Sequence, residues 1–342
     1  MALLRKVLRL VDDKPWSAHL YVTERCNLDC HYCNEYDNSV PHPTLAELTA
    51  WMQKMRALGV ERLAIQGGEP LLHPDIAAVV RTARELGFYK VSMSTNGLLL
   101  SRELLAQLEA AGLDQLQMSV DRVTPVESTR KSLKSVAHKL PWFKGSRIEL
   151  YVGGVLFSDT LDEMAQLIDS CLDQDVPVQM RVVHDDLIHK RKLRDPAARE
   201  RLLAFIGYQE RLKRNGEPIV TSWNIIDYQK RLLKSEPVDW TCVAGYKYFF
   251  VSARGQFWLC SQVRTERHIL DVTPEDLRAN NRKKDCQSVC GVYCTIDSSL
   301  RVNHPVRYLR RELSQAAAQR AARFVPGRAR RMRDFVPRAS RP

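Results

Sequence analysis

The sequence has no apolar run long enough to cross a membrane, no internal repeat and no low-complexity tract. These absences exclude a protein built from membrane-spanning helices, a solenoid and a long disordered linker. The N-terminal segment MALLRKVLRLVDDKPW contains basic residues, but Asp12, Asp13 and Lys14 interrupt its apolar pattern, and it has no small-residue cleavage site. We therefore do not interpret it as a signal peptide, and the sequence predicts a cytoplasmic protein.

Cysteine is abundant and unevenly placed in this 342-residue chain. In a reducing compartment, clustered thiols are more often metal ligands or catalysts than disulfides. Eight of the nine cysteines fall into an N-terminal and a C-terminal group: Cys26, Cys30 and Cys33, and then Cys242, Cys260, Cys286, Cys290 and Cys294. Cys171 stands alone in the helical pattern LDEMAQLIDSCLDQ, and we expect it in the core.

The positive charge is also unevenly placed. The formal net charge is +12, but residues 301–342 hold twelve arginines against Glu312 and Asp334, a balance of +10, which leaves +2 for the other residues. A basic tail on a nearly neutral body indicates a local anionic contact, and makes a nucleic-acid partner less favoured. From His304 the tail has the pattern of a basic amphipathic helix that could lie on an anionic membrane, and the alternative is a frayed, solvated terminus.

Between residues 18 and 190, short β-branched runs alternate with amphipathic helical stretches, which is typical of β-α units around a parallel sheet. We expect strands at 18–24, 62–67, 90–95, 113–120, 147–157 and 176–183. The intervening helical stretches at 45–59, 74–87 and 101–112 each end on a glycine, where a left-handed C-cap is expected. Six units are too few to close an eight-stranded barrel, so we predict an α/β fold with a partial (β/α)6 TIM-like barrel.

The pattern changes near Trp240, where residues 246–260 are typical of a hairpin turning at Arg254 and Gly255. The predicted organisation is a barrel domain over 16–235, a small Cys-rich α+β module over 236–300 and a basic helical tail over 301–342. Because parallel strands end at one edge, we expect the chemistry at the C-terminal ends of the barrel strands.

The three N-terminal cysteines lie in the run RCNLDCHYC, directly after the first expected strand. A [4Fe-4S] cluster takes four thiolates, so three on one loop leave one iron open to a substrate or cosubstrate. The alternative is a zinc knuckle, but zinc would need a fourth Cys or His at short range, and His31 has poor reach from inside the loop. We therefore favour a cluster at this loop.

The spacing CxxxCxxC, with Tyr32 before the last cysteine, resembles the defining motif of the radical S-adenosylmethionine (SAM) superfamily. Three further segments, each at the end of an expected strand, fit this family in order. The resemblance implies SAM contacts from Tyr32, from Gly67, Gly68, Glu69 and Pro70 of the GGEP segment, from Ser94 and Asn96, and from Ser119, Asp121 and Arg130. Glycine permits close approach of SAM to the backbone, and Arg130, expected in a helix, would pair with the SAM carboxylate.

The resemblance also implies the reaction. The open iron would chelate SAM, one electron would cleave the sulfonium bond, and the resulting 5'-deoxyadenosyl radical would abstract a substrate hydrogen. The electron would come from an external donor of the flavodoxin or ferredoxin type. Because this chemistry belongs to the cofactor, the protein supplies orientation and exclusion of water, and the sequence assigns no catalytic residue.

The C-terminal cysteines form a second candidate metal site. Cys242, Gly255 and Cys260 resemble the opening of the SPASM and twitch modules, which hold auxiliary iron–sulfur clusters, and Cys286, Cys290 and Cys294 follow at four-residue spacing. We favour a twitch-like module with one auxiliary [4Fe-4S] cluster, ligated by four of the five cysteines. On a continuous helix the last three would share a face, although Gly291 makes that helix doubtful. The alternative is a structural zinc site.

These features predict a radical SAM oxidoreductase that oxidises, by dehydrogenation or cross-linking, a small metabolite or a peptide. One alternative is an epimerase in which a cysteine returns a hydrogen atom, and another is a membrane-associated enzyme that modifies a lipid or glycan. Only 25 residues precede Cys26, so recognition of a peptide leader would need a separate protein. That slightly favours a small or lipid-linked substrate.

Overall fold

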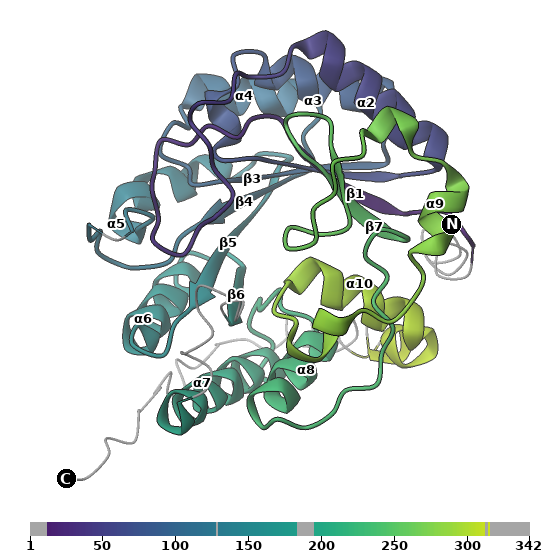
Figure 1. The fold of residues 1–342 in the computed structure, drawn as a ribbon. Helices are drawn as coiled ribbons and strands as arrows, with labels where there is room; N and C mark the ends of the chain where they lie inside the picture. The colour runs from purple at the N-terminus through teal and green to yellow at the C-terminus, as the bar shows by residue number, and fades with distance from the viewer. Residues whose placement is uncertain (1–11, 128, 183–194, 312–313, 315–342) are drawn as a thin grey trace, which may run out of the picture.

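The computed structural model describes residues 12–127, 129–182, 195–311 and 314. Six parallel strands lie in the order β6-β5-β4-β3-β2-β1, so that each new strand adds next to its predecessor (Figure 1). They are β1 (Ser17–Tyr21), β2 (Arg62–Gln66), β3 (Lys90–Thr95), β4 (Gln115–Ser119), β5 (Glu149–Leu156) and β6 (Val178–Val182). All six lie within or at the edges of the predicted ranges, and the prediction of a partial barrel is confirmed.

The helices lie on the outside of the curved sheet (Figure 1). They are α2 (Leu45–Leu58), α3 (Ile76–Glu85), α4 (Arg102–Ala111), α5 (Leu133–Val136), α6 (Leu161–Leu172), α7 (Pro196–Arg214) and α8 (Trp223–Leu233), with short 3-10 helices at Pro70–Leu72 and Ala137–Phe143. A capping box between Thr44 and Glu47 begins α2, and left-handed Gly59 and Gly112 end α2 and α4 as predicted. Cys171 in α6 is fully buried, as expected of a core thiol.

The side chains of the barrel strands alternate between an apolar outer face and a polar inner face. Leu63, Ile65, Val91 and Met93 of β2 and β3 are buried in the hydrophobic core. The inner face instead carries polar groups that line cavities: Gln66, Ser92, Ser94, Gln117, Ser119, Gln179 and Arg181. A closed TIM barrel fills its interior with branched apolar side chains, so this polar interior indicates a binding cavity.

The C-terminal cysteine-rich segment is built onto the same sheet. Strand β7 (Tyr248–Val251) pairs in parallel with β1, and β8 (Phe257–Trp258) pairs antiparallel with β7, so the sheet has eight strands. The predicted hairpin is therefore confirmed. Its turn contains Gly255 with φ 73°, in the left-handed region that glycine adopts readily. The predicted module boundary after residue 235 stays a prediction.

After the hairpin come α9 (Pro274–Ala279), 3-10 helices at Ile269–Asp271 and Asp285–Val289, and α10 (Tyr293–Asn303). Helix α10 lies between β6 and β7, the strands on either side of the opening in the barrel (Figure 1). The Tyr293 hydroxyl accepts a hydrogen bond from Gln179 of β6 (2.9 Å), and Asp297 accepts one from Ser222, the N-cap of α8 (2.8 Å). At the other end of the barrel, Cys294 of α10 interacts with Tyr248 of β7, so α10 connects the two ends.

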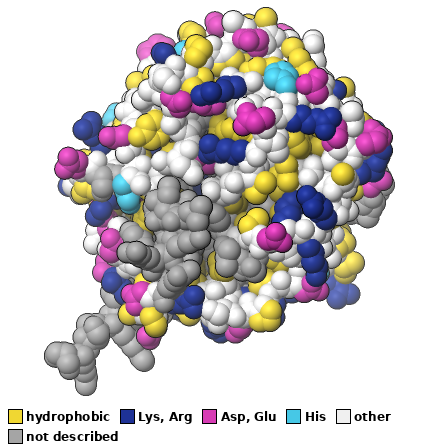
Figure 2. Space-filling model, viewed as in Figure 1, with side chains coloured by type: hydrophobic (Ala, Val, Ile, Leu, Met, Phe, Trp, Pro, Cys, Tyr) yellow, Lys and Arg dark blue, Asp and Glu magenta, His cyan; other side chains and the backbone are white. Residues whose placement is uncertain are grey.

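The start of the basic tail packs against α8. Residues 305–311 are helical, and Arg307 and Arg311 both form ion pairs with Asp227, at 3.0 and 2.6 Å. Apart from residue 314, the rest of the predicted tail lies outside the described residues. Within the described part, none of the helices is both long and apolar enough to span a membrane. Over the face seen in Figure 2, Lys and Arg side chains are interspersed with Asp and Glu.

Candidate functional site

The loop after β1 brings the thiols of Cys26, Cys30 and Cys33 close enough to interact electrostatically. The backbone N–H of Cys33 donates to the carbonyl of Cys30 (2.9 Å), and that of Cys26 donates to the Asn38 side chain (2.9 Å). Burial raises the pKa of the Cys26 thiol to about 11 and also raises that of Cys33. Iron binding would displace these protons, and three soft ligands on one ordered loop fit a [4Fe-4S] cluster with one open iron.

The GGEP loop after β2 is joined to the cysteine loop through its backbone. The N–H of Gly68 donates to the carbonyl of Thr23 (3.0 Å), and the N–H of Glu69 donates to that of Arg25 (2.8 Å). A Cβ on Gly67 would lie 2.2 Å from the Thr23 carbonyl oxygen, and one on Gly68 would lie 2.3 Å from that of Arg25. The contact between the two loops therefore requires both glycines, independently of any contact with SAM.

The Glu69 side chain holds the next strand end in place. It is 1% exposed, and its carboxylate accepts hydrogen bonds from the Thr95 hydroxyl (2.6 Å) and from the backbone N–H groups of Asn96 (2.7 Å) and Leu71 (3.0 Å). Burial raises the pKa of Glu69, although these hydrogen bonds oppose that rise. Glu69 thus positions the STNG segment after β3, and its contact with SAM stays a prediction.

A third set of contacts connects the cysteine loop with the end of β4. The Tyr32 hydroxyl donates to the carboxylate of Asp121, and the Lys131 ammonium group donates to the same hydroxyl (3.1 Å). Burial and then the Asp121 charge raise the pKa of Tyr32 well above its usual range. Burial lowers the pKa of Lys131, but the interactions with Tyr32, Asp121, Cys30 and Cys33 outweigh burial and raise this pKa well above its usual range, so Lys131 stays protonated. Lys131 thus places a positive charge beside the candidate cluster.

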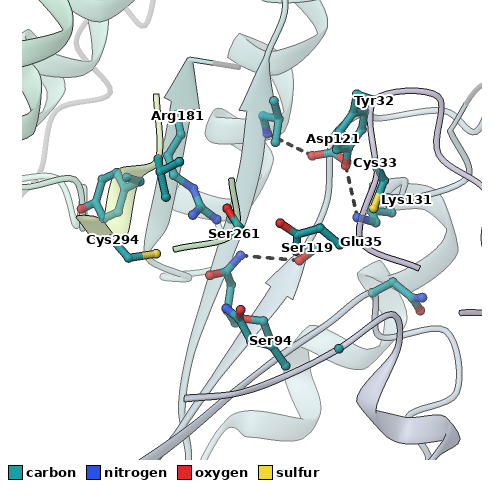
Figure 3. A pocket seen from close by; sticks show the side chains of 18 of the residues that line it. Tyr32, Cys33, Glu35, Ser94, Ser119, Asp121, Lys131, Arg181, Ser261 and Cys294 are labelled. Carbon is teal, nitrogen blue, oxygen red and sulfur yellow. Dashed lines mark hydrogen bonds between the residues drawn. The ribbon is translucent and has the colours of Figure 1, made fainter. Parts of the chain in front are cut away.

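These strand ends surround a cavity of about 300 Å³ (Figure 3). Most of the SAM contacts expected from the sequence line it together with Cys33: Tyr32, Gly67, Gly68, Glu69, Ser94, Asn96, Ser119 and Asp121. Pro70 is buried behind the loop and does not line the cavity. The structure therefore gathers four separate sequence segments around one cavity.

The structure places Arg130 differently from the prediction. Arg130 is exposed, precedes α5 and does not line the cavity, whereas its neighbour Lys131 does. The segment runs extended here, with a bridge between Arg122 and Ser132, so the side chain that points inward is one residue further along. Lys131 thus lies in the cavity, where the sequence predicted the side chain of Arg130.

A Lys131→Met variant is expected to bind SAM at least about tenfold more weakly, since the cavity loses its half-buried cation beside the candidate cluster. Lys134→Met is the matched control, because Lys134 is exposed on α5. Equilibrium dialysis of reconstituted protein with labelled SAM measures both affinities. Equal affinity in the two variants would contradict a role of Lys131 in SAM binding.

The C-terminal cysteines separate into a group of four and a fifth. Cys242, Cys260, Cys286 and Cys290 interact electrostatically with one another, and each of Cys242, Cys260 and Cys286 acts on Lys284. Cys294 instead lies beside His19, Arg181 and Tyr248 and lines the cavity inside the barrel. The sequence predicts that four of the five ligate one cluster, and the structure brings Cys242, Cys260, Cys286 and Cys290 together.

Among the described residues, no three Cys, His, Asp or Glu side chains converge on one metal ion. A [4Fe-4S] cluster does not need that convergence, because each thiolate binds a different iron.

Many residues of the cavity are missing from the sequence predictions, Glu35, Gln117 and Arg181 among them. Glu35, whose carboxylate accepts a hydrogen bond from Tyr21 (2.5 Å), lies in the cysteine loop beyond the motif, and Gln117 and Arg181 lie on the inner faces of β4 and β6. The polar residues that alternate with apolar ones in QLQMS and VQMRV were the available signal for the last two. The polar residues that follow β6 in the sequence, His184, Asp185 and Asp186, lie outside the described residues.

Comparisons with known proteins agree with this geometry. Residues 20–171 match the Radical SAM superfamily model. The PqqA peptide cyclase of Xanthomonas axonopodis pv. citri is 29% identical over 267 residues, which cover 73% of this chain and 69% of that protein. A GTP 3',8-cyclase of Limosilactobacillus fermentum is 39% identical over 110 residues, covering 30% of this chain and 33% of that one.

Solved structures show the same fold. Streptococcus suis SuiB aligns with a TM-score of 0.61 at 15% identity, covering 86% of this chain and 74% of that one. Native anSMEcpe with bound AdoMet aligns with a TM-score of 0.59 at 17% identity, covering 90% of this chain and 99% of that one. The family uses a [4Fe-4S] cluster and SAM. The cysteine loop, the strand-end cavity and the match over residues 20–171 together show that this chain contains a radical SAM domain.

Proposed function

We propose that this enzyme oxidatively modifies a peptide, with a SAM-binding cluster on Cys26, Cys30 and Cys33 and an auxiliary [4Fe-4S] cluster on Cys242, Cys260, Cys286 and Cys290. The observation that carries the proposal is the second group of four interacting thiols, built onto the barrel by the pairing of β7 with β1. Four thiolates would saturate a cluster, and a saturated cluster is suited to electron transfer and not to substrate binding.

The chain holds the auxiliary group of cysteines against the SAM site. Arg254 in the hairpin turn forms ion pairs with Glu24 (3.5 Å) and Asp37 (3.2 Å) of the cysteine loop. Arg264 donates to the carbonyl of Asn34 (3.2 Å) and stacks 4.4 Å from the ring centroid of Trp258. These contacts would fix the distance between two clusters, which electron transfer requires.

Within the cavity, the residues would orient SAM and the substrate and exclude water. Bound together, the SAM cluster and SAM supply a 5'-deoxyadenosyl radical. Gly67 and Gly68 leave the backbone open on one side, and Lys131 offers a cation on the other. Tyr21, Phe250 and Val155 supply apolar walls that would keep water away from a radical.

The peptide substrate class is supported by the relatives. The match to PqqA peptide cyclases covers most of this chain, whereas the match to GTP 3',8-cyclase covers less than a third of it. The short segment before Cys26 had slightly favoured a small or lipid-linked substrate, and these matches move the proposal to a peptide.

The auxiliary site is tested by a Cys242→Ala/Cys260→Ala double variant, reconstituted with iron and sulfide without oxygen. We expect it to lose about four iron atoms per chain while it still converts SAM to 5'-deoxyadenosine with dithionite as reductant. Iron and sulfide assays and electron paramagnetic resonance of the reduced protein measure the loss. Unchanged iron would contradict the auxiliary cluster, and zinc in place of iron in the wild-type protein would favour a structural site.

The reaction class is tested with a short peptide encoded beside the gene, incubated in D₂O with SAM and reduced flavodoxin. Oxidation predicts a product lighter by two hydrogen atoms and free of carbon-bound deuterium. An epimerase would instead return a product of unchanged composition with one deuterium on carbon. Mass spectrometry separates these outcomes, and the second would contradict the proposal.

A further inference from the structure

Cys294 lies in the barrel cavity, on the wall opposite the cysteine loop. Figure 3 shows Cys294 and Arg181 on one side of the cavity, and Tyr32, Cys33 and Lys131 on the other. Cys294 belongs to the first turn of α10, which begins at Tyr293, and a helix N-terminus favours a negative charge. A substrate placed between the two walls would face SAM on one side and this thiol on the other.

The groups around Cys294 come from the strands that line the cavity. His19 of β1, Tyr151 of β5, Arg181 of β6 and Tyr248 of β7 all interact electrostatically with the thiol. His19 is 7% exposed and Tyr248 is 1% exposed, and both line a second cavity, which shares Cys294 and Arg181 with the cavity beside the cysteine loop. His19 and Tyr248 are directed at the Cys294 thiol, and among the described residues Nε of Arg181 has no hydrogen-bond partner. Buried polar atoms are seldom left without partners, so the free Arg181 Nε beside this thiol indicates a site that accepts a polar ligand.

The same groups favour the thiolate of Cys294. Burial raises the pKa of Cys294, but the charges of His19 and Arg181 and the Tyr248 hydroxyl outweigh it and bring the pKa down to about 7. Burial without such neighbours raises the pKa of the core thiol Cys171 to about 12. Cys294 therefore differs from a packing cysteine in both its position and its surroundings.

We propose that Cys294 is a catalytic residue of this enzyme, whose thiolate accepts the substrate proton that is released during oxidation. This inference rests on the proposed function. After the 5'-deoxyadenosyl radical has taken one hydrogen atom, the substrate radical must lose one electron and one proton to become a closed-shell product. The proposed auxiliary cluster would take up the electron, and the proton would form an S–H bond on Cys294, which would later release it to solvent.

The first test asks whether Cys294 is a reachable thiol or a cluster ligand. Reconstituted wild-type protein is treated with iodoacetamide, and the modified cysteines are mapped by mass spectrometry. We expect rapid modification of Cys294, slowed at least about fivefold by SAM, and none of Cys171. Cys294→Ser should keep its full iron content, whereas Cys290→Ala should lose about four iron atoms. Iron loss in Cys294→Ser, or no modification of Cys294 in the native protein, overturns the proposal.

The second test measures the charge state of the thiol. The alkylation rate of Cys294 in wild-type protein should rise with pH through a midpoint near 7, because only the thiolate reacts. Arg181→Met removes a neighbouring cation, so its midpoint should move up by about one unit or more. A wild-type midpoint at or above about 8.5, the ordinary thiol value, overturns the role of proton acceptor.

A third measurement separates this proposal from the proposed function. Reductive conversion of SAM to 5'-deoxyadenosine without a peptide depends on the cysteine loop and not on a proton acceptor. Cys294→Ser should therefore lose peptide modification by a factor at least about tenfold larger than its loss of SAM cleavage, and so release 5'-deoxyadenosine without a matching amount of modified peptide. If wild-type protein shows no SAM cleavage, the proposed function fails. If only Cys294→Ser fails to cleave SAM while its iron content is intact, Cys294 serves SAM binding and the proton-acceptor role is overturned.

Discussion

A Cys33→Ala variant is expected to lose about four iron atoms per chain and all detectable conversion of SAM to 5'-deoxyadenosine. Cys33 lines the cavity directly, and its thiol interacts with those of Cys26 and Cys30. Two remaining thiolates on the loop cannot hold a cluster that already leaves one iron without a protein ligand. Iron and sulfide assays after anaerobic reconstitution, with chromatography of the SAM products, measure both losses.

Cys171→Ala is the matched control, because it removes a thiol that belongs to neither cysteine group. Cys171 is buried in α6, so the variant should lose some stability, of the order of 1 kcal/mol, but keep its iron and its SAM cleavage. Full iron content in Cys33→Ala would contradict the assignment of this loop. A loss of iron in both variants would point to a folding defect, which circular dichroism would detect.

The barrel strands could be predicted because their signal is local. Short β-branched runs, separated by amphipathic stretches that end on glycine, are enough to predict β1 to β6 and their parallel order. The pairing of β7 with β1 is different, because it joins Ser17 to Tyr248 across most of the chain. Local pattern alone predicts the hairpin of β7 and β8, but not the strand to which it is added.

The sequence was sufficient to predict which strand ends form the candidate site, but not which individual side chains point into it. A motif that follows a parallel strand must lie at the common edge, so the sequence was sufficient to bring Tyr32, Gly68, Asn96 and Asp121 together. The inward side chain after β4 was not predictable, because it depends on how the loop runs. The expected helix at Arg130 does not begin until Leu133, and Lys131 points inward instead.

The position of Cys294, the fifth C-terminal cysteine, could not be predicted from the sequence spacing either. Four-residue spacing places Cys286, Cys290 and Cys294 on one face only if a single helix contains all three. The 3-10 helix ends at Val289, Cys290 is extended with φ −64° and ψ 128°, and α10 begins at Tyr293. The break at Gly291 therefore sends Cys290 towards the group of four and Cys294 into the cavity.

A Gly68→Ala variant is expected to separate the GGEP loop from the cysteine loop, and so to weaken SAM binding at least about tenfold. The new Cβ would lie 2.3 Å from the carbonyl oxygen and 2.5 Å from the carbonyl carbon of Arg25, and 2.8 Å from the carbonyl oxygen of Glu24. All three atoms belong to the backbone, so no side chain can rotate away. The cost to folding should be about 1–3 kcal/mol, as in other overpacked sites.

Gly207→Ala distinguishes this steric effect from the general effect of replacing a glycine. Gly207 lies inside α7, and a Cβ there would meet only the Arg211 side chain, at 3.8 Å. Alanine is the better helix former, so this variant should unfold at the wild-type temperature or slightly above it, and bind SAM normally. Thermal unfolding of reconstituted protein and equilibrium dialysis with SAM measure both variants. If Gly68→Ala had the same unfolding temperature and the same SAM affinity as Gly207→Ala, the two loops could move apart without loss of stability or binding. The backbone contact between them would then not be what holds the cluster beside the SAM cavity.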